Sequence, residues 1–255
     1  MTTAKLIFNS KIKPNDETDF AVESILPSLC KNGQIFSEYV IAKKNLGYDV
    51  FVTLPEKTSL KKVNNNKWVN HEYERLVKAG LEKPKVKIIC EIDSSKGVCC
   101  CSQPQTYILF THFLDTVTPI MCGDCWLIVP LYRILPIPED SENSELLTWQ
   151  ADYKACDTLQ MHCRTGERFA IAQMEKHESS LSKRGRKICS KIEEYLGKPV
   201  YYYLDHISYK NLEAERDRKC PSCSSEWKLA KPLHSIFDYR CVDCRLLSNI
   251  SWEIR

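Results

Sequence analysis

The sequence predicts an α+β protein with a small metal-binding module at its C-terminus. Segments with helical spacing and segments with strand-like composition both occur, without the regular alternation of a doubly wound sheet. The 255 residues, of which 43% are hydrophobic and 27% charged, are enough to bury a core and are not typical of a disordered chain. Fourteen cysteines, several in closely spaced pairs, indicate metal ligands rather than disulfides in a reducing compartment.

In the N-terminal part, apolar periodicity and β-branched runs predict the elements. We expect strands at Lys5–Asn9, Tyr48–Leu54 and Val86–Ile92, and helices at Asp19–Leu29 and Trp68–Leu81. Asp16 or Thr18 is expected to cap the first helix, and Gly80 to end the second. The Lys- and Asn-rich segment Glu56–Asn66 lacks an apolar period and predicts an exposed loop.

The rest of the main body follows the same rules. We expect strands at Thr106–Phe113, Trp126–Ile134 and Val200–Leu204, and helices at Ser144–Met161 and Ser179–Leu196. The acidic segment Pro136–Glu145 is expected to be a surface connection. We place the main body at residues 1–212 and the C-terminal module at residues 213–255.

The C-terminal module carries two closely spaced pairs of cysteines. Cys220 and Cys223 form the first pair, and Cys241 and Cys244 form the second. Two such pairs can place four thiolates around one zinc ion in a closed tetrahedral shell. The spacing predicts a zinc ribbon, whose strands we expect at Glu226–Leu229 and Phe237–Arg240.

A second set of four cysteines lies inside the main body. Cys99 and Cys101 point the same way if the backbone is extended, and Cys122 and Cys125 form the facing pair. Gly123 is expected to give the second turn its φ freedom. We predict a second zinc site here; partly buried free thiols are the alternative, and Cys100 could replace Cys99 or Cys101 as a ligand. A site with four protein ligands leaves no position for substrate, so both sites are expected to be structural.

Several stretches resemble one bacterial family. They are Cys99–Pro104, Tyr107–Thr111, Cys122–Cys125, Val129–Ile134, Trp149, Asp152–Asp157, Leu159–Met161, Gly166–Phe169, Pro199–Leu204 and the terminal ribbon. The family consists of zinc-ribbon-containing proteins for which nucleic-acid binding has been suggested and whose biochemical role is largely unassigned. The resemblance implies that both cysteine sets are metal ligands. Some members are similar to proteins found beside secreted toxins, which implies an immunity role for these members.

We expect no catalytic site. His162 and Cys163 are adjacent on a predicted helix and do not face each other, and Cys156 and Cys163 are expected to share a buried stripe. Asp152 and Asp157 could meet on one helix, although solvated acids are more frequent than catalytic pairs. The sequence contains no glycine-rich phosphate loop and indicates no small-molecule substrate.

Two kinds of macromolecular partner fit the sequence. For nucleic acid, residues 42–87 contain eleven Lys and Arg against five Asp and Glu, Lys183–Lys187 adds four cations, and the ribbon combines cations with aromatics. Those ribbon residues are Lys228, Lys231, Arg240, Arg245, Trp227, Phe237 and Tyr239; for Trp227 and Phe237 the alternative is a small core of the ribbon itself. For protein, Trp149, Tyr153, Tyr201 and Tyr203 are candidate anchors if exposed, with an aromatic core as the alternative.

The net charge of only +3 favours a protein partner over nucleic acid. We therefore predict a non-catalytic bacterial immunity-type protein that binds and neutralises a toxin, with a nucleic-acid-binding zinc-ribbon protein as the alternative. The longest apolar runs are too short to cross a bilayer, and the first seven residues lack the features of a secretory signal. We expect a cytoplasmic location.

Overall fold

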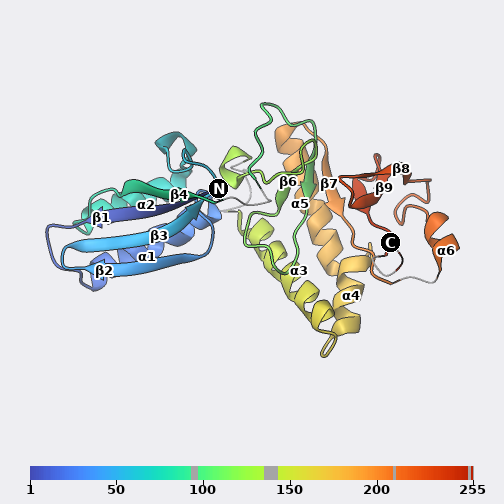
Figure 1. Cartoon of the computed structure of the whole chain (residues 1–255), viewed down its shortest axis with the longest axis horizontal. Coiled ribbons are helices and arrows are strands. Elements are labelled where there is room, and N and C mark those ends of the chain that lie inside the picture. The colour runs from blue at the N-terminus through green and yellow to red at the C-terminus, as the bar shows by residue number, and fades with distance from the viewer. Residues whose placement is uncertain (93–96, 135–142, 209–210, 252–253, 255) are drawn as a thin grey trace. The chain divides into compact units, whose positions relative to one another are not determined.

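The computed structural model describes residues 1–92, 97–134, 143–208, 211–251 and 254 (Figure 1). Contacts within the chain define two compact units. The first comprises Met1–Cys100, Thr116–Thr118 and Leu127–Ser144, and the second comprises Cys101–Asp115, Pro119–Trp126 and Glu145–Arg255. Both units contain helices and strands, which confirms the predicted α+β class. The boundary expected after residue 212 stays a prediction.

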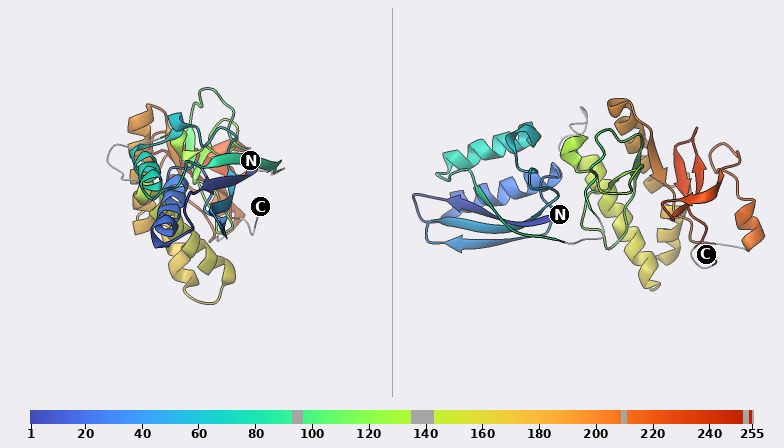
Figure 2. Two further views of the ribbon diagram at one scale, coloured as in Figure 1. Left: turned by 90° about the vertical axis from the view of Figure 1, so that its left-hand side faces the viewer. Right: turned by 45° about the horizontal axis from the view of Figure 1, so that its top comes forward.

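The first unit is built on a four-stranded antiparallel sheet in the order β2-β3-β1-β4. Its strands are β1 (Thr2–Asn9), β2 (Tyr39–Lys44), β3 (Gly47–Leu54) and β4 (Lys85–Glu91). Helices α1 (Asp16–Lys31) and α2 (Lys67–Lys78) lie together on one side of the sheet (Figure 2). The chain order β1-α1-β2-β3-α2-β4 is that of a ferredoxin-like fold, which leaves the second face of the sheet without a helix.

The core of this unit lies between the sheet and its two helices. Alternate residues of β1 and β3 point toward the helices and are buried, whereas their neighbours are more accessible. The buried side chains include Leu6, Phe8, Val50, Val52, Ile25, Leu26 and Leu76. Burial of each large apolar side chain is worth roughly 1.5–3 kcal/mol, so this cluster is the main source of the unit's stability.

Local sequence signals set the ends of α1. The cap is Asn15 rather than the expected Asp16 or Thr18: its side chain accepts the N–H of Thr18 at 3.0 Å, and the hydroxyl of Thr18 accepts the N–H of Asn15 at 2.9 Å. This reciprocal pair is a capping box, in which Thr18 is the partner and not the cap. The expected loop after β3 contains a short 3₁₀ helix, Lys62–Asn64, and is only partly exposed, with Ser59 buried.

The second unit contains a six-stranded mixed sheet in the order β6-β5-β7-β10-β9-β8. Its strands are β5 (Tyr107–Leu109), β6 (Ile120–Cys122), β7 (Val200–Tyr203), β8 (Lys228–Leu233), β9 (Phe237–Cys241) and β10 (Leu246–Ser248). Strands β5, β7 and β10 are parallel neighbours, and the other pairs are antiparallel. Strand β10 of the C-terminal module pairs with β7, so the module continues the sheet of the preceding segment.

Four helices accompany this sheet: α3 (Ser144–His162), α4 (Glu167–Glu175), α5 (Ser180–Leu196) and α6 (Leu212–Arg216). Helices α3 and α5 lie beside β7 (Figure 1), and the indole Nε1–H of Trp149 donates to the carbonyl of Leu181 at 3.2 Å. Gly185 lets α5 approach the sheet, because a Cβ there would lie 2.2 Å from Cε2 of Tyr202. None of the described helices combines the length and apolar character needed to cross a bilayer.

Some expected elements differ. Trp126–Ile134 is not a strand, because Trp126 has a φ of +59° and Pro130, which lacks an N–H, precedes the 3₁₀ helix Leu131–Arg133. Only Ile128 pairs, in an isolated bridge with Val98. Most of the expected connection Pro136–Glu145 lies outside the described residues. The short elements β2, β6, α4, α6 and β10 were not predicted, since packing rather than local pattern defines them.

Candidate functional site

Four cysteine thiols meet in the C-terminal module. The Sγ atoms of Cys220, Cys223, Cys241 and Cys244 all lie within 4.8 Å of one another. A zinc ion bound to four thiolates at about 2.3 Å holds their sulfur atoms about 3.8 Å apart. The Sγ atoms of Cys223 and Cys241 are 3.6 Å apart, so the group could hold one zinc ion with small adjustments.

Two of these thiols differ in their acidity. Hydrogen bonding with the hydroxyl and backbone N–H of Ser225 lowers the pKa of the exposed Cys223 to about 6. Burial raises the pKa of Cys241 to about 12. A cation at the centre of the group would favour the thiolate form of both.

Two aromatic residues of the ribbon, Trp227 and Tyr239, pack on each other, whereas Phe237 packs against Phe110, Trp126 and Tyr203 outside the ribbon. Trp227, Phe237 and Tyr239 are buried, and the guanidinium of Arg218 lies 4.2 Å from the centre of the Tyr239 ring. The indole of Trp227 donates to the carbonyl of Arg218 at 2.8 Å. These rings are therefore not available for base stacking, contrary to the interpretation that paired them with the ribbon's cations. Arg240 and Arg245 are also engaged, the first with Tyr201 and the second with Glu193.

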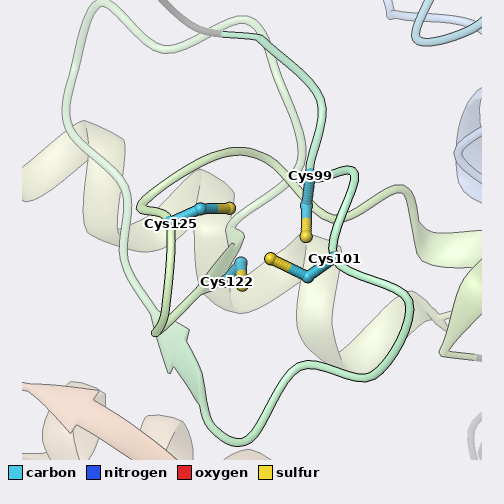
Figure 3. A group of neighbouring side chains, drawn as sticks. All are labelled: Cys99, Cys101, Cys122 and Cys125. Atoms are coloured by element: carbon cyan, nitrogen blue, oxygen red, sulfur yellow. The ribbon is translucent and has the colours of Figure 1, made fainter.

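The second predicted set also comes together. The Sγ atoms of Cys99, Cys101, Cys122 and Cys125 lie within 4.8 Å of one another, and Figure 3 shows their sulfur atoms turned toward a common centre. Cys99 and Cys122 are buried, whereas Cys100 is exposed and outside the group. The structure thus groups Cys99 and Cys101, and not Cys100, with the second pair.

Three of the four half-sites share one backbone geometry. The residue after the second cysteine is left-handed in each Cys-x-x-Cys turn, with φ of +59° at Trp126, +61° at Ser224 and +53° at Arg245. The N–H of Trp126 donates to the carbonyl of Cys122 at 2.9 Å, and the N–H of Ser224 donates to that of Cys220 at 2.8 Å. The Cys122 turn is therefore built like the two turns of the ribbon.

Gly123 has a different role from the one expected. Its φ is not positive, so it does not supply left-handed backbone. A Cβ at this position would lie 2.0 Å from Oγ1 of Thr106, and the N–H of Gly123 donates to the carbonyl of Thr106 at 2.8 Å. Glycine is required because the turn packs directly against Thr106, the residue before β5.

The residues weighed for catalysis do not form a site together. Asp152 is exposed and pairs with Arg184 at 2.5 Å, whereas the buried Asp157 accepts the N–H of Phe113 at 2.7 Å. Cys156 is buried on α3, but Cys163 is exposed beyond its end. The expected buried stripe joining these two cysteines is wrong, because α3 ends at His162.

Two features considered for interaction have other partners in the structure. Trp149, Tyr153, Tyr201 and Tyr203 are all at most 5% exposed, so the alternative, an aromatic core, is confirmed. Most cations of the run Lys183–Lys187 are occupied by acids of the same unit. Lys183 and Arg186 pair with Glu178, at 3.0 and 3.6 Å, and Arg184 pairs with Asp152.

The open face of the first sheet, which sequence reasoning missed, presents an ordered set of side chains. Strand register aligns Val40, Phe51, Lys5 and Lys87 in one row across β2, β3, β1 and β4. Val40 is 65% exposed and Phe51 is 40% exposed. The alternation of apolar and polar residues within β1 and β3 indicates a sheet face that does not belong to the core. Strand β2, which completes this face, was not predicted.

Positive charge exceeds negative charge on this face. The next row contains Asp49 and Lys85, and Asp49 pairs with Lys5 at 3.0 Å and with Lys44 at 2.7 Å. Hydrogen bonds from Lys44 and Lys5 hold the pKa of Asp49 below its usual value despite partial burial. Lys85 and Lys87 are exposed, and no described residue forms an ion pair with either.

Comparisons with known proteins place the chain among relatives without an assigned role. Domains of unknown function match in succession: DUF8589 at residues 1–90, DUF2310 at residues 101–205 and DUF8594 at residues 210–254. A Haemophilus influenzae protein described as uncharacterized is 33% identical over 227 residues, 87% of each chain. A second, also described as uncharacterized, is 37% identical over 152 residues, 60% of this chain and 74% of the relative. No solved structure matches the chain significantly.

Proposed function

We propose that this chain, which belongs to the family of these two Haemophilus influenzae proteins and contains the DUF2310 domain, is a non-catalytic protein stabilised by zinc. We propose further that it binds single-stranded nucleic acid on the open face of its first sheet. The observation that carries the proposal is the row formed by Val40, Phe51, Lys5 and Lys87. The two cysteine groups would supply stability and leave no ligand position for turnover.

The donor sets support zinc. Thiolates suit zinc better than the hard cations calcium and magnesium, which prefer oxygen ligands. Four sulfur atoms within 4.8 Å of one another fit a tetrahedral ion in each group. Both groups use four protein ligands, as structural zinc sites do.

The sheet supports an unpaired nucleic acid. Four-stranded sheets with two helices on one face can bind RNA on the other face, where aromatic side chains stack on bases. Phe51 lies in a central strand of the open face with Lys5 opposite it on β1. A base stacked on Phe51 would place its phosphates within reach of Lys85 and Lys87, whereas Lys5 is held by Asp49. A duplex would hide the base faces that such stacking needs.

The experiment is fluorescence anisotropy with labelled oligonucleotides of single-stranded RNA, single-stranded DNA and a duplex of the same sequence. We expect Phe51→Ala to weaken single-strand binding by about tenfold or more, because one stacked base is worth 1–3 kcal/mol. Phe20→Ala is the matched control, since Phe20 is 59% exposed on α1 of the same unit. It should bind as the unaltered protein does.

The lysines give a second readout. We expect Lys87→Ala to lower the slope of log affinity against log salt by about 0.7, the loss of one phosphate contact to a single strand. Lys78→Ala, an exposed lysine on α2, should leave the slope unchanged. Absence of single-strand binding, or equal effects of the Phe51 and Phe20 variants, would reject the open face.

A toxin as partner stays a prediction. The four aromatic residues considered as protein anchors are buried, so the support for that role has weakened. Co-expression with a neighbouring toxin gene that restores growth, together with no oligonucleotide binding, would favour it over the proposal made here.

A further inference from the structure

A pocket of about 480 Å³ lies within the second unit, at one edge of its sheet. Its wall includes residues that follow β5 (Phe110–Phe113), β7 (Asp205 and Ile207) and β10 (Ser251). These three strands are parallel neighbours, so their carboxyl ends meet at this edge. Ligands of sheets with parallel strands bind beyond the carboxyl ends of those strands, and the volume suits a small molecule.

The pocket combines aromatic walls with two acids. Phe110, Phe113, Tyr153 and Tyr203 line it together with Asp157 and Asp205. The described lining contains no lysine or arginine. The one basic residue of the described lining, His112, lies 3.0 Å from Asp115, so the pocket is mainly apolar with an excess of acidic groups.

Each carboxyl group is fixed through one oxygen. Oδ2 of Asp157 accepts the N–H of Phe113 at 2.7 Å. Oδ1 of Asp205 accepts the hydroxyl of Tyr203 at 2.7 Å and the N–H of His206 at 2.8 Å. Among the described residues these bonds leave Oδ1 of Asp157 and Oδ2 of Asp205 able to accept from a ligand.

Burial of the two acids makes pairing with a cation favourable. Burial raises the pKa of Asp157, and burial together with the charge of Asp157 raises the pKa of Asp205 to about 6. Removing a carboxylate from water is costly unless a cation pairs with it. A ligand cation would pair with the two carboxylates, which no lysine or arginine of the described lining does.

We propose that this pocket binds a small organic cation, whose amidinium, guanidinium or ammonium group pairs with Asp157 and Asp205 while its apolar part contacts the aromatic wall. Charge-assisted hydrogen bonds to carboxylates are the strong ones, and aromatic faces attract cations. An anion would be repelled. Calcium would need six to eight oxygen ligands, more than two carboxylates in an apolar wall provide. This inference is independent of the open sheet face.

Benzamidine and benzamide are the probes, because they have nearly the same shape and only benzamidine is charged. Isothermal titration calorimetry with the full zinc-loaded chain at pH 7.5 should show benzamidine binding at least about tenfold tighter than benzamide, the effect of one hydrogen bond to a charged group. Equal affinities for the two probes, or no benzamidine binding, would overturn the proposal whatever happens in the variants.

The variants locate the site. We expect Asp157→Asn and Asp205→Asn each to weaken benzamidine binding by about tenfold, with benzamide binding unchanged. Asp152→Asn is the matched control, because Asp152 lies on the same helix as Asp157 but pairs with Arg184 outside the pocket. A benzamidine affinity insensitive to both pocket variants, or equally sensitive to the Asp152 variant, would place the cation elsewhere and reject the site.

Discussion

The two units of the chain reach stability by different means. The first buries a continuous cluster of mainly aliphatic side chains between one sheet and two helices, and it keeps its ionised groups at the surface. The second buries Asp157, Glu215 and Asp238 along with its aromatic rings, and it contains the ribbon's four cysteines. The contrast teaches that a unit which buries carboxylates needs additional links, whereas a core whose buried polar residues are uncharged, such as Asn32 and Gln34 of the first unit, is sufficient without them.

One such link is His206. Its Nδ1 lies 2.7 Å from Glu175 on α4, and its Nε2 lies 2.6 Å from Glu215 on α6. The same residue's N–H contacts Asp205 at the pocket. These contacts tie the short helix α6 to α4, and they hold the loop that carries a pocket acid.

The largest expected effect comes from removing a zinc ligand of the ribbon, which should affect the second unit and not the first. Cys220→Ser should remove one zinc ion and unfold the ribbon, because apparent zinc binding of about 10–16 kcal/mol in such modules is also folding free energy. Metal analysis should show the loss, and tryptophan fluorescence should report exposure of Trp227, which is 2% exposed in the fold. Hydrogen exchange in β1 and β3 of the first unit should not change.

Cys101→Ser tests the other group in the same way, with Cys100→Ser as a neighbouring control outside it. The Cys100 variant should keep two zinc ions and the Cys101 variant one. If all three serine variants retain the metal content of the unaltered chain, or if that chain binds none, the zinc proposal fails. Loss of protection in β1 after Cys220→Ser would contradict the contrast between the units.

A smaller effect is the change in the free energy of unfolding when one acid of each unit is replaced, and its sign should differ between the units. The pKa of Asp205 is raised to about 6 from 3.8, so the native state resists its ionisation and loses stability as the pH rises between these values. Asp205→Asn keeps an acceptor for Tyr203 and His206 and removes this penalty. We expect the free energy of unfolding to rise by up to about 3 kcal/mol above pH 7 and to be unchanged below about pH 4.

Asp49→Asn in the first unit should act in the opposite direction. Lys44 and Lys5 lower the pKa of Asp49, so its ionised form stabilises the fold above the unfolded pKa, and that stability is lost as the pH falls through the native pKa. The substitution should cost up to about 1 kcal/mol at pH 7, as expected for a surface ion pair. Denaturant titrations across pH measure both variants, and a loss of stability at pH 7 in the Asp205 variant would contradict the raised pKa.

Sequence reasoning succeeded where the signal is local. Cysteine spacing identified both groups because ligands two residues apart must turn toward one ion. The helix expected at Ser179–Leu196 is α5, Ser180–Leu196, with Ser179 as its N-cap and Gly197 as its C-cap, because caps act within one turn.

Sequence reasoning failed where distant segments meet. The pocket combines residues 110–113, 153–161 and 203–207 with Ser251, and nothing in any one of these segments predicts the others. Likewise, Tyr201 and Tyr203 were candidate anchors because alternate residues of a strand often face solvent on one side of the sheet. The buried residues of β7 lie in an inner strand, between β5 and β10, and both of its faces are covered.

The smallest expected effect concerns the backbone of the ribbon. Ser224 has a φ of +61°, which costs a residue with a Cβ about 1–2 kcal/mol and costs glycine almost nothing. The greater freedom of glycine in the unfolded chain offsets part of the gain, so Ser224→Gly should stabilise the ribbon by about 0.5–1 kcal/mol. Ser222→Gly in the same turn, at a position without a positive φ, should weaken it slightly. Because folding and metal binding are coupled here, competition with a zinc chelator measures both, and a lower zinc affinity in the Ser224 variant would show that its hydroxyl, and not its backbone, matters.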